Sequence, residues 1–304
     1  MPSPLPAWIT VLDEVAEALS GGRPVVALET TLVTHGLPRP ANLQIAHRME
    51  REIRSAGAVP ATIGVMEGRV YVGMAADRLE RLATAQGARK ISRRDLAAGV
   101  AKRWAGGTTV AATMALADLA GIRVFATGGI GGVHRGQDGD VSADLPELAR
   151  THVAVLCSGA KSILDLRRTL EWLETAGVPV LGWETDDFPA FFSRSSALPV
   201  TARVDGPEEA AAAIRAHWAL KNAGGVLVCA PCPADVQVPQ ADMETALRQA
   251  EAEAAQKAVR GPALTPFLLD RVADLTGGAT LRANLALLAQ NARLAGRLAA
   301  ALAA

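Results

Sequence analysis

The chain has 304 residues, of which 50% are hydrophobic and 20% are charged, so it can build one large α/β domain or two small ones. Its formal net charge is zero, with 31 basic and 31 acidic residues, which argues against a basic surface for nucleic-acid polymers. No apolar window of about 18 residues predicts a membrane span, and the N-terminus lacks a signal-peptide pattern, while three cysteines do not suggest a disulfide framework. We therefore expect a cytoplasmic protein whose partner is a small molecule, with no nucleic acid and no membrane involved.

Short apolar runs rich in β-branched residues alternate with amphipathic stretches along the chain. The expected buried strands are Val25–Leu28, Thr62–Met66, Val124–Thr127, Val153–Cys157, Val178–Gly182 and Gly225–Cys229. The expected helices are Ile9–Leu19, Ala41–Ala56, Arg93–Arg103, Thr109–Ala120, Leu145–Arg150, Ser162–Ala176, Pro207–Asn222, Pro239–Ala258 and Thr280–Ala301. Glu67–Met74 suggests part of a short antiparallel pair. This alternation predicts a layered α/β fold with a mostly parallel sheet. No linker or repeat divides residues 1–304, so we expect a single domain.

The first candidate for chemistry is Glu29, which directly follows the apolar run Val25–Leu28. Ligands of parallel α/β sheets bind at the carboxyl ends of strands. A carboxyl group there can act as a general acid, and partial burial would raise its pKa toward neutrality. The alternative is an exposed or salt-bridged glutamate.

The next candidate along the chain is Lys90, which lies close to Arg93 and Arg94. Together they could hold a phosphate, or they could be exposed charges that flank a helix. The segment Gly106–Thr109 also opens a helix, and the free backbone amides of a helix start offer an anion pocket.

The stretch from Thr127 to Asp165 concentrates several kinds of chemistry. It begins with the glycine-rich segment Gly128–Gly132, which lacks the spacing of a dinucleotide-binding fingerprint and favours close backbone approach to a ligand. His134 and Arg135 follow after Val133.

Three aspartates come next, Asp138, Asp140 and Asp144. Carboxylate oxygens suit Mg²⁺ or Mn²⁺, which often need only one or two protein ligands. Asp144 has a structural alternative, because Asp144 and Glu147 match a capping box with the aspartate as N-cap. Asp140 has no comparable alternative.

Lys161 closes the stretch, directly before the expected helix Ser162–Ala176. The positive field of a helix N-terminus would lower its pKa and free its amine, which could then form a Schiff base with a carbonyl carbon. The chain has only five lysines against 26 arginines, so each lysine draws attention. The alternative is a solvated lysine at an ordinary helix start. Further on, Asn284 and Asn291 share one helix face, and their partner could be a ligand or the backbone.

Eight ordered motifs make the chain similar to a known family. They are VALETTLVTHGLPRPAN, GVMEGRVYVGM, KISRRDL, GGTTVAATMALA, ATGGIGGVHRG, DVSADLPELA, SGAKSILDL and LTPFLLDRVADLTGG. The chain resembles the pseudouridine-5'-phosphate glycosidase family, which is also called indigoidine-synthase-A-like, from about Val25 to Asn291.

The resemblance implies a three-layer α/β/α fold, a homotrimer and one divalent metal per subunit, typically Mn²⁺, with Mg²⁺ or another divalent ion as an alternative. It implies reversible cleavage of the carbon–carbon glycosidic bond of pseudouridine 5'-phosphate to uracil and ribose 5-phosphate. The expected route passes through a lysine imine with ring-opened ribose.

The resemblance also implies roles for single residues. Lys161 resembles the nucleophile, Glu29 the proton donor and Asp140 the metal ligand. Asp144 is expected to position groups or relay protons. The expected substrate-binding residues are Lys90, Val110, Ser142, Ala143, Asp144, Thr127, His134 and Asn284, the last of which would read the uracil edge.

Two positions depart from the family pattern. Ala230 replaces a usual asparagine, and Pro262 replaces a usual lysine, which puts the substrate range in question. Two other functions therefore stay open. One is a related lysine-imine lyase or glycosidase that acts on another sugar phosphate. The other is a non-catalytic sugar-phosphate sensor, which would bind without turnover.

Overall fold

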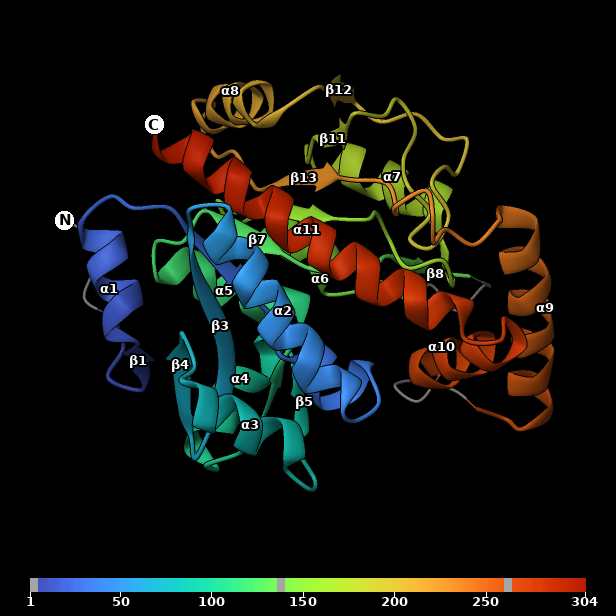
Figure 1. Cartoon of the computed structure of the whole chain (residues 1–304), viewed down its shortest axis with the longest axis horizontal. Helices are drawn as coiled ribbons and strands as arrows, with labels where there is room; N and C mark the ends of the chain where they lie inside the picture. Colours follow the sequence, from blue (N-terminus) through green and yellow to red (C-terminus); the bar gives the residue numbers. More distant parts are fainter. Residues whose placement is uncertain (1–4, 136–139, 260–263) are drawn as a thin grey trace.

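The computed structural model describes residues 5–135, 140–259 and 264–304 (Figure 1). These ranges contain an 11-stranded sheet with the order β1-β4-β3-β2-β7-β9-β13-β11-β12, to which β6 attaches through β3, and β5 through β6. The strands are β1 (Ile9–Val11), β2 (Val25–Leu28), β3 (Val59–Met66), β4 (Arg69–Val72), β5 (Arg89–Ile91), β6 (Gly106–Thr108), β7 (Val124–Ala126), β9 (Ala154–Cys157), β11 (Val180–Trp183), β12 (Ala202–Val204) and β13 (Val226–Cys229). A separate two-stranded pair joins β8 (Val133–His134) to β10 (Leu164–Asp165).

Parallel pairing dominates the sheet. It runs without interruption from β3 through β2, β7, β9, β13 and β11 to β12. The strands β2, β7, β9, β11 and β13 are buried along their whole length. A parallel sheet is covered on both faces, so its strands appear in the sequence as continuous apolar runs.

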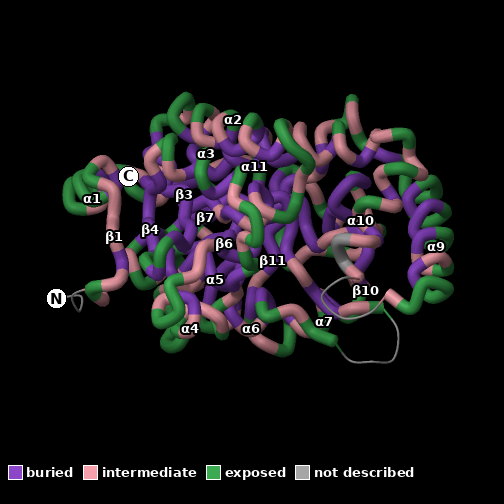
Figure 2. Tube along the Cα trace, turned by 90° about the horizontal axis from the view of Figure 1, so that it is seen from below, coloured by how far each residue is buried: buried purple, intermediate pink, exposed green. Residues whose placement is uncertain are grey.

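Helices cover both faces of the sheet. Figure 2 shows α2, α3 and α11 on one side and α4, α5, α6 and α7 on the other. The helices are α1 (Asp13–Ser20), α2 (Ala41–Ser55), α3 (Ala76–Thr84), α4 (Leu96–Ala101), α5 (Val110–Leu119), α6 (Asp144–Leu148), α7 (Leu166–Thr175), α8 (Pro207–Trp218), α9 (Gln240–Gln256), α10 (Leu264–Leu275) and α11 (Ala279–Ala303). Two short turns complete them, a π-helical one at Leu32–Gly36 and a 3-10 one at Arg93–Asp95. The predicted α/β fold with a mostly parallel sheet is confirmed, and the antiparallel pairing of β4 with β3 is confirmed with it.

The first predicted helix was placed too early. Residues Ile9–Val11 form β1, which pairs with Val70–Val72 of β4, and the helix begins only at Asp13. Ile9 and Val11 are apolar, β-branched residues at alternate positions, which suits a strand at the sheet edge. The local sequence allows either a helix or a strand there, and pairing with β4 favours the strand.

Several short elements escaped the sequence analysis. Strands such as β5, β6 and β12 have three residues each, which is too short for a periodic pattern to appear. The three cysteines are free and buried. Among the helices of the described ranges, none combines the length and apolarity needed to cross a membrane.

Candidate active site

Glu29 lies at the carboxyl end of β2 and is half-buried. The Thr127 hydroxyl, at the end of the neighbouring strand β7, donates a 2.6 Å hydrogen bond to Glu29 Oε1. Desolvation raises the pKa of Glu29, while the positive charge of Lys161 and the Thr127 hydrogen bond oppose that rise. The expected rise in pKa is confirmed, so Glu29 holds its proton to higher pH than an exposed glutamate does.

A buried network of threonines fixes the loop that follows Glu29. The hydroxyl of Thr30 donates to Ile63 O (2.7 Å) and accepts from Thr108 N (3.0 Å). Thr108 Oγ1 also donates to Ile63 O (2.7 Å), and Thr113 donates to Thr108 Oγ1 (2.9 Å). The β2 loop is therefore attached to both β3 and β6.

The glycine-rich turn, residues 128–132, extends the pairing of β7 with β9 beyond the ends of both strands. Ser158 N donates to Gly128 O (2.8 Å), and Ile130 N donates to Gly159 O (3.0 Å). Lys161 N then donates to Ile130 O (3.1 Å). The backbone of Lys161 is thus attached directly to this turn.

The predicted helix start at Lys161 is wrong. The chain after Lys161 makes a turn and enters β10, and α7 begins only at Leu166, with Asp165 Oδ1 accepting from Arg168 N (3.0 Å) as its cap. Pairing of β10 with β8 holds this segment in extended form. The field of a helix N-terminus therefore does not act on Lys161.

Four charged side chains influence one another at this point of the molecule. The pKa of Lys90 on β5 is lowered, first by desolvation and then by the positive charge of Lys161, although much of the Lys90 side chain is exposed. Asp144 and Glu29 oppose this lowering of the Lys90 pKa. The structure thus gathers two lysines and two carboxyl groups, which come from four separate segments of the chain.

The predicted capping role of Asp144 is also wrong. Asp144 is the first residue of α6, its N-cap is Ala143, and no side chain caps this helix. The Asp144 carboxylate instead accepts hydrogen bonds from Gly131 N (2.7 Å) and Ala111 N (2.9 Å). Ala111 lies in the first turn of α5, where amides have no partner within the helix. The Ala111 amide at the helix start, where we considered an anion pocket, therefore donates its hydrogen bond to the protein's own Asp144 carboxylate.

The contact between Asp144 and the turn requires glycine at position 131. A Cβ atom there would overlap Ser142 Oγ and would lie 2.7 Å from Ser142 Cβ and 2.9 Å from Asp144 Oδ2. Ser142 N donates to Gly132 O (3.0 Å), which ties the segment Ser142–Asp144 to the turn. Ser142 is half-buried and Ala143 is exposed, while Val110, the first residue of α5, is buried.

Asp140 lies beside His134 at the edge of this region. His134 N donates to Asp140 O (2.9 Å), and His134 Nε2 lies 3.8 Å from Asp140 Oδ2, which belongs to a side chain that is 66% exposed. The described ranges hold no group of three or more His, Cys, Asp or Glu residues able to hold a metal, and Asp138 lies outside them. One open carboxylate fits a divalent ion that keeps most of its waters, and does not fit a closed protein cage.

The two asparagines of α11 differ in their surroundings. Asn291 is fully buried, and its Nδ2 donates to Thr127 O (2.9 Å) and lies 3.1 Å from Ser158 Oγ, so its partners belong to the protein itself. Asn284 is half-buried beside Gly128. Its side chain makes no hydrogen bond to other described residues, which leaves its amide free to bind a ligand.

The sequence drew attention to Arg135 without showing what it does. Its Nε donates to Leu164 O (3.2 Å), and one terminal nitrogen donates to Ser162 O (3.4 Å). Arg135 therefore fixes the turn that follows Lys161. No sequence pattern connects residues that lie 27 and 29 positions apart.

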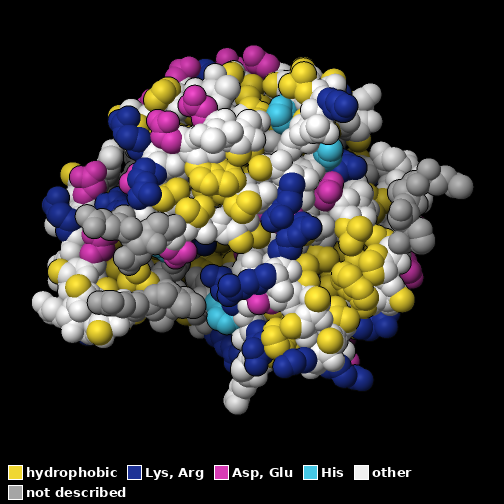
Figure 3. Space-filling view, turned by 180° about the vertical axis from the view of Figure 1, so that it is seen from behind, with side chains coloured by type: hydrophobic (Ala, Val, Ile, Leu, Met, Phe, Trp, Pro, Cys, Tyr) yellow, Lys and Arg dark blue, Asp and Glu magenta, His cyan; other side chains and the backbone are white. Residues whose placement is uncertain are grey.

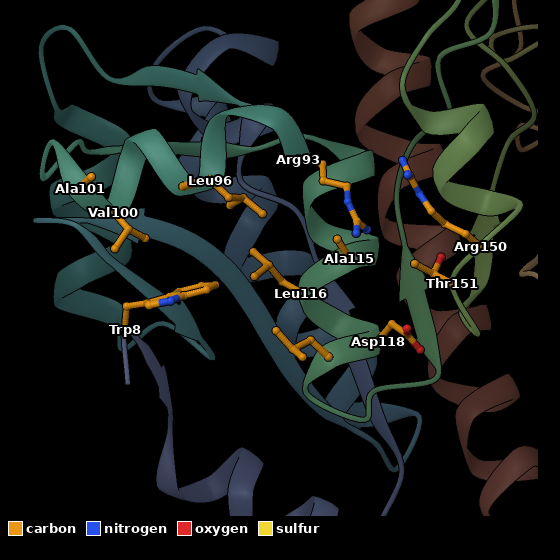
Figure 4. Close-up of a pocket in the computed structure, with 12 residues that line it drawn as sticks. Trp8, Arg93, Leu96, Val100, Ala101, Ala115, Leu116, Asp118, Arg150 and Thr151 are labelled. Carbon is orange, nitrogen blue, oxygen red and sulfur yellow. The ribbon is translucent and has the colours of Figure 1, made fainter. Parts of the chain in front are cut away.

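An apolar groove of about 620 Å³ lies elsewhere on the molecule (Figure 4). It is lined by Trp8, by Leu96 and Val100 of α4, and by Leu116 and Leu119 from the last turns of α5. Leu119 is 47% exposed. The face opposite to Figure 1 shows several patches of hydrophobic side chains (Figure 3). None of the candidate catalytic residues lines this groove, so we assign it no chemistry.

We expect Gly131→Ala to destabilise the protein, because the added methyl group meets Ser142 and Asp144. Overpacking of this kind costs about 1–3 kcal/mol. Urea denaturation would measure the loss. Gly99→Ala is the matched control, since the nearest atoms there are 3.7 Å away. The double variant Gly131→Ala/Ser142→Gly should recover part of the lost stability. A Gly131→Ala protein that is as stable as the unsubstituted protein would contradict the close contact.

We expect Glu29→Gln to gain stability relative to the unsubstituted protein as pH rises. The fold raises the pKa of Glu29, so the native state keeps a proton that the unfolded chain releases. The native protein therefore loses stability as pH rises from the pKa of an ordinary glutamate to the raised pKa of Glu29. Glutamine does not titrate, yet it can still accept the Thr127 hydrogen bond. Denaturation at several pH values would measure the difference, which should level off above the raised pKa. Exposed Glu80→Gln should show no such trend, and a flat Glu29→Gln profile would contradict the raised pKa.

Comparisons with known proteins bear on the whole chain. Residues 14–301 match the family model described as "Indigoidine synthase A like protein". A curated pseudouridine-5'-phosphate glycosidase of Rhodospirillum centenum is 59% identical over 296 residues, which cover 97% of this chain and 92% of that protein. One of Solibacter usitatus is 53% identical over 288 residues, which cover 94% of this chain and 96% of that protein.

Two solved structures are also similar. The prealnumycin C-glycosynthase AlnA, in complex with ribulose 5-phosphate, has a TM-score of 0.92 and 43% identity, with 98% of each chain covered. An indigoidine synthase A-like protein from Thermotoga maritima has a TM-score of 0.90 and 36% identity, with 99% of each chain covered.

Proposed function

The chain belongs to the indigoidine synthase A-like family, and from this membership we propose that it is a pseudouridine-5'-phosphate glycosidase. The enzyme reversibly cleaves the carbon–carbon bond between uracil and ribose 5-phosphate. The observation that carries this function is the identity of 53–59% with glycosidases of that name over nearly the whole chain. The ribulose 5-phosphate complex of the C-glycosynthase agrees with a sugar phosphate as ligand.

The first step of the proposed mechanism opens the ribose ring. Glu29, whose pKa is raised by burial, gives a proton to the ring oxygen of the ribose. The neutral amine of Lys161 attacks the anomeric carbon, and the bond from that carbon to the ring oxygen breaks. The nitrogen loses one proton to solvent, and an open-chain adduct that still carries uracil results.

The second step breaks the carbon–carbon bond. The nitrogen lone pair forms a C=N double bond to the anomeric carbon, and the pair from the broken bond goes to carbon 5 of uracil, which takes a proton. Water then hydrolyses the imine, which releases ribose 5-phosphate and restores the lysine. This route differs from the two-carboxylate glycosidase scheme because the leaving atom is carbon.

We assign the remaining groups to binding. Lys90 is a cation beside Lys161 and suits the substrate phosphate. Both Asp144 oxygens accept backbone amides, which supports a positioning role. The remaining expected contacts are Val110, Ser142, Ala143, Thr127 and His134, with Asn284 at the uracil edge.

We propose a divalent metal, Mn²⁺ or a similar ion such as Mg²⁺, held by Asp140 through waters. When bound, such an ion supplies positive charge that helps to order a phosphate and its surrounding waters. The exposed Asp140 carboxylate, with His134 as its neighbour, supports this assignment.

We further propose that the enzyme is a homotrimer, as the family resemblance implies, and that it is cytoplasmic, as the three free cysteines suggest. The apolar groove with exposed Leu119 is the face that we expect to meet a second copy, since burying it would remove apolar surface from water.

We expect the protein to release uracil from pseudouridine 5'-phosphate in the presence of Mn²⁺, and we expect Lys161→Ala and Lys161→Arg to reduce the rate to background. Alanine has no nucleophile, and a guanidinium stays protonated and cannot form an imine. Chromatography of uracil measures the reaction. Borohydride added with ribose 5-phosphate should trap the sugar on Lys161, as peptide mass spectrometry would show.

Lys221→Ala, which removes an exposed lysine at the end of α8, should leave the rate unchanged. Full activity of Lys161→Ala would refute the mechanism. A trapped adduct without uracil release would favour a related lysine-imine enzyme of another sugar phosphate. Binding without either reaction would favour the sensor.

We expect removal of metal to lower the rate of uracil release, and Asp140→Asn to weaken Mn²⁺ binding about tenfold or more, because an amide lacks the charge of a carboxylate. Electron paramagnetic resonance of free Mn²⁺ measures binding directly. Asp242→Asn, at an exposed position of α9, is the control. Equal Mn²⁺ affinity in Asp140→Asn and the unsubstituted protein would contradict the assignment of Asp140.

A further inference from the structure

A second cavity, of about 460 Å³, opens at the carboxyl ends of β11 and β13. It lies between the start of α8 and the second half of α11, which are side by side in Figure 1. Its polar lining includes three arginines, Arg194, Arg293 and Arg297, together with Glu184 and Asp205. None of the residues assigned to the Lys161 site lines it.

The arginines of this cavity are poorly neutralised by the protein. Within the described ranges, Arg297 has neither an ion pair nor a hydrogen bond, and Arg293 has only Glu52 at 4.0 Å. Arg194 donates to the backbone oxygen of Cys232 (2.8 Å), which leaves its charge uncompensated. The Asp205 carboxylate is already engaged by Arg203 (2.6 Å). The cavity therefore has an excess of positive charge.

Glu184 is the one carboxylate of the lining without a cation partner among the described residues. It follows β11 with a left-handed backbone (φ 53°), which a non-glycine residue rarely adopts. Its N–H donates to Val204 O (2.9 Å), which fixes this conformation. No ion pair joins Glu184 to the three arginines, although they line the same cavity. Strained backbones of this kind concentrate at binding sites.

The segment between Glu184 and Arg194 holds these groups in place. Phe188 N donates to Leu198 O (2.7 Å), and Phe191 N donates to Ser158 O (3.0 Å). Ser193 Oγ donates to Val238 O (2.7 Å). Because both ends of the segment are attached to other elements, the backbones of Glu184 and Arg194 are held in place, while their side chains are exposed to an incoming ligand.

We propose that this cavity binds a second phosphorylated small molecule with hydroxyl groups, such as a sugar phosphate. Guanidinium groups bind phosphate through charge-assisted, often bidentate hydrogen bonds, and they remain charged at every relevant pH. A carboxylate accepts hydrogen bonds from hydroxyls. A ligand whose phosphate binds Arg293 and Arg297 and whose hydroxyl donates to Glu184 would give partners to both the guanidinium groups and the carboxylate. These groups form no ion pair with each other in the protein.

Titration calorimetry with ribose 5-phosphate tests the site. The unsubstituted protein should bind at the cavity in addition to any binding at the Lys161 site. Arg293→Gln/Arg297→Gln should weaken or remove one binding event, about tenfold or more for each lost charged contact. Arg248→Gln, at an exposed position of α9, is the control. Thermal melting confirms that each variant is folded, and the single variants replace the double one if it is not.

Glu184→Gln separates the two halves of the site. It should weaken binding of ribose 5-phosphate at the cavity, while inorganic phosphate should bind as well as before or better, because a negative charge is gone. If the arginine variants bind ribose 5-phosphate and inorganic phosphate as tightly as the unsubstituted protein does, the proposal is overturned. Equal effects of Glu184→Gln on both ligands would overturn the role of the hydroxyl groups.

Discussion

Close backbone packing at the glycine-rich turn, residues 128–132, is the constraint on which the candidate active site depends. The turn continues the pairing of β7 with β9, so it fixes the backbone of Lys161 through Ile130 O. The same turn donates Gly131 N to Asp144. Side chains at Gly129 or Gly131 would meet neighbouring atoms at less than 3 Å. Glycine therefore allows three distant segments to meet at one point.

The same arrangement leaves the charged form of Glu29 disfavoured. Glu29 is desolvated at the end of β2, and its ordinary charged form is costly there. The Thr127 hydroxyl and the charge of Lys161 offset only part of that cost. A carboxyl group whose pKa is raised holds its proton to higher pH and is more useful as an acid, so the unfavourable burial and the proposed chemistry have one physical cause.

The sequence could predict the core strands and several of the residues that gather at the site. The buried run Val25–Leu28 showed where β2 ends, and hence where Glu29 lies at the edge of the sheet. Lys161 was identified for a reason that the structure contradicts, because pairing of β10 with β8 outweighed the helical pattern. The bonds of Asp144 to Gly131 and Ala111 span 13 and 33 positions, and no local pattern encodes contacts of that range. Local sequence patterns thus identified the candidate side chains, while tertiary contacts determine which partners each of them has.

The two cavities and the candidate active site differ in how far the protein pairs its own charged and polar groups. Near Lys161, the Asp144 carboxylate accepts the Ala111 amide of α5, so this amide is already paired within the protein, and our proposal assigns the substrate phosphate to the side chain of Lys90 instead. At β11 and β13, Arg194 and Arg297 have no carboxylate partner among the residues that the structure describes, and Arg293 has only Glu52 at 4.0 Å. Positive charge that the protein leaves uncompensated at the carboxyl end of a parallel sheet is available to an external anion. In the apolar groove at the far end of α5, Arg93 and Arg150 both pair with Glu147, and Leu119 is exposed, so burial of apolar surface is the main interaction that it offers.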